Sequence, residues 1–189
     1  MSFNYLTKIT DINKIFLDKF LKEGSTVIDA TMGNGYDTKY LAEKVGETGF
    51  VYAFDIQDVA IKNTTKLLEK YNLKNNTKLI NDSHENILEY HTGNVDCIMF
   101  NLGYLPSGDH NLITKPDSTI NALKDSLKIL NKNGIISITI YSGHKGGQEE
   151  KEAVLEFVQS LPQTDYSVFM SKFINQINNP PELILIEKR

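Results

Sequence analysis

The chain has 189 residues, of which 40% are hydrophobic, and a formal net charge of −4. This length suits one α/β domain and is short for two, and the composition predicts a packed core rather than a disordered chain. The negative charge excludes proteins that coat nucleic acid through bulk positive charge, and no apolar run approaches the roughly 20 residues of a membrane span. We therefore expect a single domain over residues 1–189, with residues 1–23 as an N-terminal helical segment.

The start of the chain, MSFNYLTKITDINKIF, has polar residues throughout and is not typical of a secretory signal. Cys97 is the single cysteine, which excludes an internal disulfide and a cysteine-rich zinc site. It lies in the apolar run VDCIMF, where we expect a buried core thiol. Four scattered histidines do not predict a metal site. Together these features favour a cytoplasmic protein without bound metal.

Segments of helical and extended character alternate along the chain. The first predicted helix covers residues 10–22 and places Ile12, Ile15, Phe16 and Phe20 on one face. Further helices are predicted over residues 37–45, 58–71, 83–90, 116–130 and 148–161. Strands are predicted over residues 25–30, 50–56, 77–82, 95–102, 134–141, 166–173 and 181–188. This alternation predicts an α/β fold, with a mostly parallel seven-stranded sheet and helices on both faces.

Polar residues follow the predicted strands at the edge where ligands bind in such sheets. Asp29 ends the first strand and precedes the turn TMGNGYDT, whose glycines allow positive φ and a close backbone approach to a ligand. Asp55 ends the second strand about 20 residues later, where a carboxylate accepts hydrogen bonds from ribose hydroxyls. Asp82, Ser83 and His84 follow the third strand, and NLGYLP ends the fourth. This series of strand ends is more specific than the glycine turn alone.

The turn lacks the third glycine, near Thr38, that a dinucleotide site has. Its D-x-T-x-G-x-G pattern and the second-strand acid resemble class I S-adenosylmethionine-dependent methyltransferases, in which this turn meets the methionine part of the cofactor. DATMGNGYDT, FDIQ, FNLGYLP, TKPDST and FINQINNPPELILIEK together resemble a family labelled as rRNA methylases, from about residue 10 to the C-terminus. Its characterised members methylate the 5-aminomethyl group of the tRNA wobble uridine. Members usually have His where Tyr36 stands.

The resemblance implies a Rossmann-like methyltransferase sandwich that binds S-adenosylmethionine. The residues that it implies for cofactor binding are Asp29, Thr31, Gly33, Asn34, Gly35, Asp37, Thr38, Asp55, Gln57, Asp82, Ser83, His84, Asn101 and Gly103. Helix capping is the alternative for several of them. Asp37 and Thr38 are candidates to cap the helix after the turn, Asp55 the next helix, and Asp82 with its two neighbours the short helix near residue 84.

NLGYLP is similar to the (D/N)-P-P-(Y/F) box of methyltransferases that act on nitrogen. In those enzymes the first side chain accepts hydrogen bonds from the target amine and the aromatic ring stacks on the base, which implies catalytic roles for Asn101 and Tyr104. Leu102 and Gly103 stand where that box has prolines, which suggests an alkylamine rather than a planar base amine. A solvent loop is the alternative, although Leu102 and Leu105 are unusual residues for one.

Two further segments are candidates for substrate binding. YSGHKGG follows the fifth strand at the same edge, and a glycine-rich mobile loop is the alternative to substrate contact there. FINQINNPP contains several asparagine and glutamine residues beside two prolines. These residues are poor strand formers, which favours a loop that reads nucleotides. The residues implied for substrate binding are Tyr104, Tyr141, His144, Asn175, Gln176 and Asn178.

The expected reaction converts 5-aminomethyl-uridine to 5-methylaminomethyl-uridine at the tRNA wobble position, with S-adenosylmethionine as methyl donor. The expected partner is a tRNA anticodon stem-loop, without DNA or membrane, and a homodimer remains open. Arg189 is the sole arginine, so phosphates would be bound by lysines without a bidentate fork. The alternatives are N-methylation of rRNA or of a small-molecule amine, and a non-catalytic cofactor-binding RNA or regulatory module.

Overall fold

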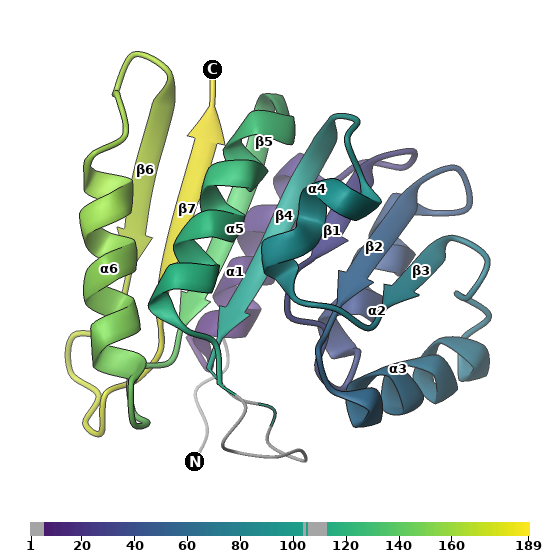
Figure 1. Ribbon diagram of the computed structural model, residues 1–189, viewed down its shortest axis with the longest axis horizontal. Coiled ribbons are helices and arrows are strands. Elements are labelled where there is room, and N and C mark those ends of the chain that lie inside the picture. Colours follow the sequence, from purple (N-terminus) through teal and green to yellow (C-terminus); the bar gives the residue numbers. More distant parts are fainter. Residues whose placement is uncertain (1–5, 104, 106–112) are drawn as a thin grey trace.

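The computed structural model describes residues 6–103, 105 and 113–189. A seven-stranded sheet with strand order β3-β2-β1-β4-β5-β7-β6 forms its centre (Figure 1). The strands are β1 (Thr26–Asp29), β2 (Phe50–Phe54), β3 (Thr77–Ile80), β4 (Val95–Leu102), β5 (Leu130–Ile140), β6 (Tyr166–Ser171) and β7 (Glu182–Lys188). The helices are α1 (Ile9–Phe20), α2 (Tyr36–Val45), α3 (Asp58–Lys70), the short 3-10 helix η1 (His84–Asn86), α4 (Ile87–Tyr90), α5 (Pro116–Ile129) and α6 (Gly147–Gln159).

The strand pairs from β3 to β5 are all parallel, whereas β7 is antiparallel to both β5 and β6. The prediction of a mostly parallel seven-stranded α/β sheet is therefore confirmed. β5 begins at Leu130, directly after α5 and earlier than predicted. Its first residue pairs with Val95, and the register shifts between Val95 and Cys97, so the extra residues form an irregular start to the strand.

Helices cover both faces of the sheet, as the continuous apolar strands predicted. α5 and α6 pack on the face that contains Ile98 and Phe100 of β4, while α1 and α2 pack on the opposite face with Cys97 and Met99. Figure 1 shows α5 and α6 in front of the sheet and α1 behind it. Cys97 is 1% exposed, and burial raises the pKa of its thiol to about 12, so it is the buried core thiol that was expected. Within the described residues, no helix has the length and apolar character needed to cross a bilayer.

α1 differs from the prediction in the face that it buries most deeply, since Ile12, Phe16 and Phe20 are only partly buried. The sequence pattern places Ile15 on the buried face of this helix, but the Ile15 side chain is 57% exposed. The buried residues of α1 are Ile9, Asn13 and Leu17, which are spaced by four. Asn13 belongs to this stripe because its Oδ1 accepts a hydrogen bond of 2.8 Å from the buried Ser137 hydroxyl of β5. The prediction for Ile15 was wrong because a hydrophobic pattern does not anticipate a polar residue in the buried stripe.

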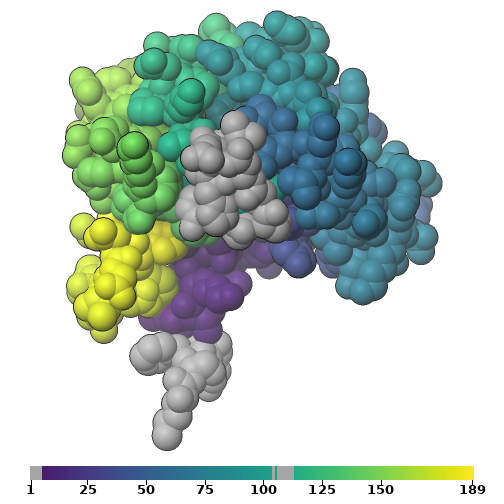
Figure 2. Space-filling model, turned by 60° about the horizontal axis from the view of Figure 1, so that its bottom comes forward, coloured from purple at the N-terminus to yellow at the C-terminus, as the bar shows by residue number. Residues whose placement is uncertain are grey.

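The parallel strands all point toward one edge of the sheet, the lower edge in Figure 1. Figure 2 views the molecule with this edge turned forward: α6, in green, lies on one side and α3, in blue, on the other. Loops that follow β1, β2, β4 and β5 therefore meet at this edge. Ligands of open α/β sheets bind beyond the carboxyl ends of the strands, so the fold concentrates candidate site residues here.

Candidate active site

A cavity of about 620 Å³ opens at this edge, which is a volume typical of cofactor and small-molecule sites. Most of the residues proposed from the sequence line its wall: Thr31, Gly33, Asn34, Asp37, Asp55, Gln57, Asp82, Ser83, His84, Asn101, Gly103, Tyr141 and His144. The proposed residues that lie away from the wall are Asp29, Gly35, Thr38, Asn175, Gln176 and Asn178. Tyr104 lies outside the described residues.

The turn after β1 takes positive φ at both glycines, 55° at Gly33 and 81° at Gly35. A Cβ on Gly35 would lie 2.6 Å from the hydroxyl oxygen of Thr64, so this glycine allows the turn to pack against α3. Gly33 lies at the cavity wall, where its N–H donates to Asp55 over 2.9 Å and its carbonyl accepts from Thr64 over 3.2 Å. The first glycine thus presents backbone to the cavity, and the second serves packing.

Asp29 stabilises this turn from the side that faces away from the cavity. Its side chain is fully buried, accepts a hydrogen bond of 2.6 Å from the Thr38 hydroxyl, and accepts one of 3.2 Å from the Thr31 N–H. Burial raises the pKa of Asp29 to about 7, with the hydrogen bond from Thr38 acting in the opposite direction. Thr38 is equally buried and binds Asp29 rather than capping α2, whose N-cap is Gly35. Both residues hold the shape of the turn without lining the cavity.

Asp55 connects the end of β2 to the same turn. Its Oδ2 accepts from Gly33 N, and its Oδ1 accepts a hydrogen bond of 2.9 Å from Gln57 N. Burial raises the pKa of Asp55, while these backbone hydrogen bonds lower it. Each carboxylate oxygen has two lone pairs, so Asp55 keeps acceptor capacity on the cavity side. Asn34 also lines the cavity, and its Oδ1 accepts a hydrogen bond of 3.0 Å from Asn63 of α3.

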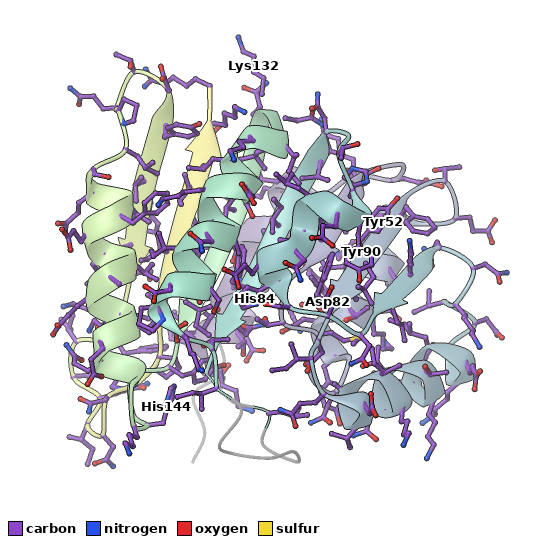
Figure 3. The ribbon with its side chains drawn as sticks, in the orientation of Figure 1. Tyr52, Asp82, His84, Tyr90, Lys132 and His144 are labelled. Carbon is purple, nitrogen blue, oxygen red and sulfur yellow. The ribbon has the colours of Figure 1, made fainter. Side chains whose placement is uncertain are left out.

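The segment after β3 forms another wall of the cavity (Figure 3). Asp82 accepts hydrogen bonds of 2.8 Å from the Tyr90 hydroxyl and 2.7 Å from Ser83 N, and the Tyr90 hydroxyl is the main reason that its pKa is lowered. The Ser83 hydroxyl oxygen accepts from Glu85 N, so the capping alternative is correct for Ser83. One segment thus combines a helix cap with a place on the cavity wall.

His84 is the most deeply placed polar residue of this segment, with 8% of its surface exposed. Its Nδ1 lies 3.1 Å from the carbonyl oxygen of Ala30, and since a carbonyl only accepts, Nδ1 carries the proton. Burial lowers the pKa of His84 and favours the neutral ring. In this tautomer Nε2 is an acceptor, and among the described residues no hydrogen-bond donor reaches it.

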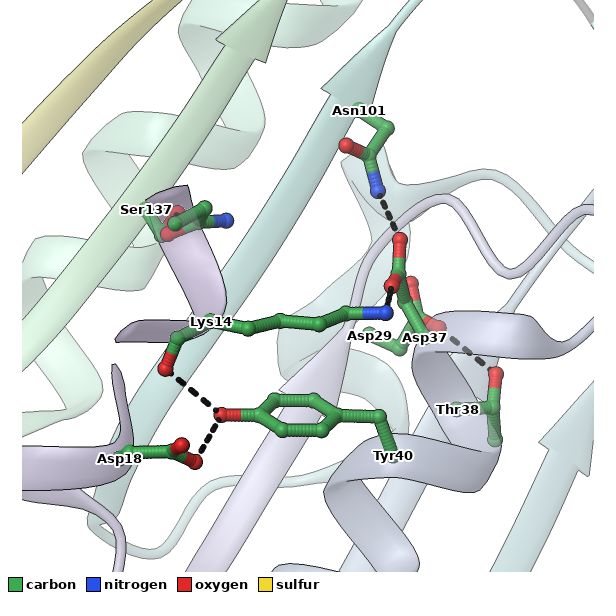
Figure 4. Close-up of polar contacts among 9 residues, drawn as sticks. Lys14, Asp18, Asp29, Asp37, Thr38, Tyr40, Asn101 and Ser137 are labelled. Atoms are coloured by element: carbon green, nitrogen blue, oxygen red, sulfur yellow. Dashed lines mark hydrogen bonds and ion pairs between the residues drawn. The ribbon is translucent and has the colours of Figure 1, made fainter. Parts of the chain in front are cut away.

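Asn101, at the end of β4, is held in a defined orientation (Figure 4). Its N–H donates to the Thr31 hydroxyl over 2.6 Å, and its side-chain Nδ2 donates to Asp37 over 2.9 Å. The other oxygen of Asp37 forms an ion pair of 2.8 Å with Lys14 of α1. Asp37 therefore fixes which end of the Asn101 amide points away from it. Oδ1 of Asn101 is buried and accepts no hydrogen bond from any described residue.

Tyr141 and His144 follow β5 and complete the wall beside Gly103. A Cβ on Gly103 would lie 3.5 Å from Cβ of Tyr141 and 3.6 Å from Nε2 of His144. Burial raises the pKa of Tyr141, and the negative charge of Asp37 adds to this effect. The YSGHKGG segment is thus placed at the cavity, although the structure does not assign it a substrate.

The segment 172–181 joins β6 to β7 at the same edge of the sheet. Asn175, Gln176 and Asn178 are exposed, and none of them lines the cavity. Asn179 does line it, and both Asn178 and Asn179 have positive φ, at 65° and 50°. Asparagine is among the few residues that adopt this conformation readily, which gives the amide-rich sequence a local structural role.

Several residues of the site were not found from the sequence. Lys14 reaches the site from α1, and no local pattern indicates that this helix packs beside the glycine turn. Met32, Leu105, Thr114 and Ser118 line the cavity and lie within the quoted segments DATMGNGYDT, FNLGYLP and TKPDST, but none was proposed as a site residue, and Ile113 lies outside these segments. The apolar character of Leu105 was noted in the sequence, and its burial at 7% exposure explains why a leucine stands there.

Comparison with known proteins gives a consistent assignment. A family model described as "Putative rRNA methylase" matches residues 51–187 of the chain. The "tRNA (mnm(5)s(2)U34)-methyltransferase, chloroplastic" of Arabidopsis thaliana is 40% identical over 194 residues, which cover 96% of this chain and 70% of that protein.

Two solved structures are similar over the whole chain. A protein of Clostridium thermocellum described as a "putative rRNA-methylase" has 47% identity and a TM-score of 0.94, and the match covers 100% of both chains. A "putative methyltransferase" of Streptococcus mutans, solved in complex with SAH, has 40% identity and a TM-score of 0.88, again over 100% of both chains. With a family model that covers most of its length and relatives at this identity, the chain belongs to the rRNA methylase family of S-adenosylmethionine-dependent methyltransferases, which have the class I Rossmann-like fold.

Proposed function

We propose that the chain methylates the 5-aminomethyl group of uridine at the wobble position of tRNA and produces 5-methylaminomethyl-uridine. The observation that carries this proposal concerns Asn101, a residue of the cavity wall: among the residues that the structure describes, no donor reaches its buried Oδ1. An unpaired buried acceptor costs free energy, and a donor that arrives with the substrate would recover it. The relative from Arabidopsis thaliana, which is named as a tRNA wobble methyltransferase, supports tRNA as the source of that donor.

The cofactor would lie across the ends of β1 to β3. Asp55 retains acceptor capacity for ribose hydroxyls, and the neutral His84 presents Nε2 as an acceptor suited to the adenine amino group. Gly33 and Asn34 would meet the methionine end, where the glycine lets the backbone approach. Bound S-adenosylmethionine would supply an electrophilic methyl group on a sulfonium. The acidic side chains of the wall, Asp37 and Asp55 among them, suit that positive charge.

The amine would be oriented by the end of β4. An N–H of the amine donates to Asn101 Oδ1, which turns the nitrogen lone pair toward the methyl carbon. A free alkylamine has a pKa near ~10, by analogy with lysine, so it loses a proton before it attacks. Methyl transfer from the bound cofactor would form the C–N bond and break the C–S bond, with the electron pair of that bond left on sulfur. The methylated ammonium then releases a proton to solvent.

The whole chain would work as one domain, since α1 packs on β5 and β7 and contributes Lys14 to the site. The RNA partner would be the anticodon stem-loop, whose unpaired bases are accessible to a cavity of this kind. The target base must leave its stack to enter the cavity. We retain the cytoplasm as the proposed location.

Replacement of Asn101 by alanine tests the proposal. We expect Asn101→Ala to lower kcat about 10²-fold or more, by analogy with the loss of one preorganised hydrogen-bonding group in other active sites, with cofactor affinity nearly unchanged. The measurement is nucleoside mass spectrometry of tRNA that carries 5-aminomethyl-uridine, incubated with the protein and S-adenosylmethionine. Asn131→Ala is a matched control, because Asn131 also donates to an aspartate, over 2.7 Å to Asp96, outside the cavity lining.

Other outcomes point to other functions. Methyl transfer to rRNA or to a small amine, with tRNA untouched, would reject the proposed substrate and keep the enzyme class. Cofactor binding without transfer to any of these acceptors would favour a non-catalytic binding module. If the Asn101→Ala protein methylates tRNA at the wild-type rate, the proposed hydrogen bond between the amine and Oδ1 of Asn101 is rejected.

A further inference from the structure

We propose that Glu150 is a positioning residue for methyl transfer: acting through the Thr114 hydroxyl, it holds Gly103 and with it the amine-binding end of β4. This inference rests on the proposed function, because it takes the Asn101 segment as the site that receives the amine. The observation that carries it is a continuous line of hydrogen bonds from the interior to the cavity wall. Glu150 lies outside every motif in the sequence, and its side chain is 1% exposed.

The line of hydrogen bonds joins three segments of the chain. Glu150 lies in the first turn of α6, and its Oε2 accepts a hydrogen bond of 2.7 Å from the Thr114 hydroxyl. The same hydroxyl oxygen accepts a hydrogen bond of 2.9 Å from Gly103 N, two residues after Asn101. Thr114 N in turn donates to the Gly103 carbonyl over 2.9 Å. Gly103 is therefore held through both of its backbone polar groups by one threonine.

The Glu150 carboxylate fixes the orientation of the Thr114 hydroxyl. An ionised carboxylate only accepts, so the single proton of the Thr114 hydroxyl is committed to Glu150. The Gly103 N–H can only donate, so it uses a lone pair of the same oxygen, and the carboxylate fixes the rotation of the hydroxyl that accepts it. The second oxygen of Glu150 accepts from the Thr119 hydroxyl over 2.6 Å, which holds the carboxylate in place. Because Thr119 binds the carboxylate at the oxygen that does not face Thr114, it offers a comparison within one cluster.

Packing alone gives little reason for an acid at this position. A buried carboxylate carries a large desolvation cost, and apolar residues of similar volume are often at least as stable in such places. Burial raises the pKa of Glu150, although the two threonine hydroxyls and the nearby His144 oppose the shift. The first turn of α6 favours a negative charge through the helix dipole. The hydroxyls of Thr114 and Thr119 each donate to one oxygen of the carboxylate, and this arrangement of donors suits an acid that directs Thr114.

The position of Gly103 matters because it lies between Asn101 and Tyr104. Gly103 has φ of 154°, and the space where a Cβ would stand is bordered by Tyr141 and His144. Loss of the Thr114 hydroxyl would free the Gly103 N–H and let this end of β4 shift. A displacement of about 1 Å at a reacting group costs about 10²-fold in rate.

The test uses four single variants of the full chain. Thr114→Val and Glu150→Met remove the hydroxyl and the acceptor, and we expect each to lower kcat about 10- to 100-fold while KM for tRNA stays within about twofold. Thr114→Ser keeps the hydroxyl and should retain activity near that of the wild type. Thr119→Val removes the other hydrogen bond to Glu150 but leaves the Thr114 hydroxyl on Gly103, so it should lower kcat clearly less than Thr114→Val does. Wild-type turnover in both Thr114→Val and Glu150→Met, or an equal loss in Thr119→Val, would overturn the inference.

A second measurement separates this inference from the proposed substrate. Hydrogen exchange of the Gly103 amide, followed by NMR without any RNA, should become about 10-fold faster in Thr114→Val and Glu150→Met and change less in Thr119→Val. Unchanged Gly103 exchange in the first two variants would also overturn the positioning role. If wild-type protein fails to methylate tRNA while the exchange pattern is as expected, the proposed function is rejected. The positioning of Gly103 by Thr114 and Glu150 is then still supported.

Discussion

At the scale of single residues, the carboxyl groups of the site differ because their surroundings differ. Asp82 is exposed enough to remain solvated and has its pKa lowered by the Tyr90 hydroxyl. Asp29 lies in the interior, and burial raises its pKa from 3.8 to about 7. The pKa values of two acids at equivalent strand ends are thus shifted in opposite directions. Sequence alone does not distinguish them, because each simply follows an apolar strand.

The raised pKa of Asp29 predicts a loss of stability as pH rises. The folded state holds the Asp29 proton more tightly than the unfolded state, so the free energy of unfolding falls as pH increases from about 4 to 7. The contribution is about 4 kcal/mol, at about 1.4 kcal/mol for each unit of pKa shift. Urea unfolding of wild type and Asp29→Asn at several pH values measures it, as the difference between the two proteins. The exposed Asp165→Asn is the control, and a wild-type advantage that does not fall with pH would contradict the prediction.

At the scale of elements, the turn between β1 and α2 shows what a motif requires for the fold and what it requires for a ligand. Gly33 and Asn34 line the cavity, whereas Gly35, Asp29 and Thr38 shape the turn from behind. The motif was recognised from its spacing, but spacing does not separate these two tasks. Only the packing of the turn against α3 does so, since it places Thr64 next to Gly35.

Replacement of Gly35 by alanine should therefore reduce stability. Positive φ costs an L residue about 1–2 kcal/mol, and the contact of 2.6 Å with Thr64 adds about 1–3 kcal/mol of overpacking. Gly143→Ala is the control: Gly143 also lies in a loop, a Cβ there would meet nothing within 4 Å, and we expect a change within about 0.5 kcal/mol. Denaturant unfolding measures both variants. Recovery of part of the loss in Gly35→Ala with Thr64→Ala would identify the contact, and equal effects at the two glycines would argue against it.

The elements themselves were largely predictable. Alternating apolar runs and amphipathic segments predicted each strand and helix, with ends that differ from the structure by a few residues, because local pattern and burial agree in a parallel sheet. The place of Asn101 at the cavity wall was also predictable, since its box is local in sequence, whereas its role stays a prediction. Lys14 and Glu150 were not found, because they reach the site from α1 and α6, and their partners Asp37 and Thr114 are distant in the chain. Tertiary packing, which no local pattern records, brings them there.

At the scale of the whole molecule, charge and surface predict how RNA would be held. The net charge is −4, so a broad basic face is not expected, and the exposed loop from Lys172 to Pro181 lies at the edge where the cavity opens. Asn179 joins this loop to the cavity wall. We therefore propose that a few lysines and the amide side chains of this loop contact the RNA.

A salt titration of anticodon stem-loop binding tests this arrangement. Each phosphate neutralised contributes about −0.7 to the log-log slope for single strands, so a few contacts predict a shallow slope. Asn175→Ala combined with Gln176→Ala should weaken RNA binding and leave cofactor binding unchanged. The control pair is Asn75→Ala with Gln163→Ala, since both residues are exposed and precede β3 and β6 at the opposite edge. A steep slope, or a loop variant that binds RNA like wild type, would mean that lysines elsewhere hold the RNA.

The place of β7 in the sheet affects how the chain folds during its synthesis on the ribosome. β7 lies between β5 and β6 although it is made after both, and β6 pairs within the sheet only through it. Until β7 has left the exit tunnel, the long apolar edge of β5 has no neighbour on that side and β6 has none to join. Unpaired edges of this kind are open to association with other chains. The nascent chain therefore completes its sheet only after β7 has been made, and until then its open strand edges are accessible to chaperones.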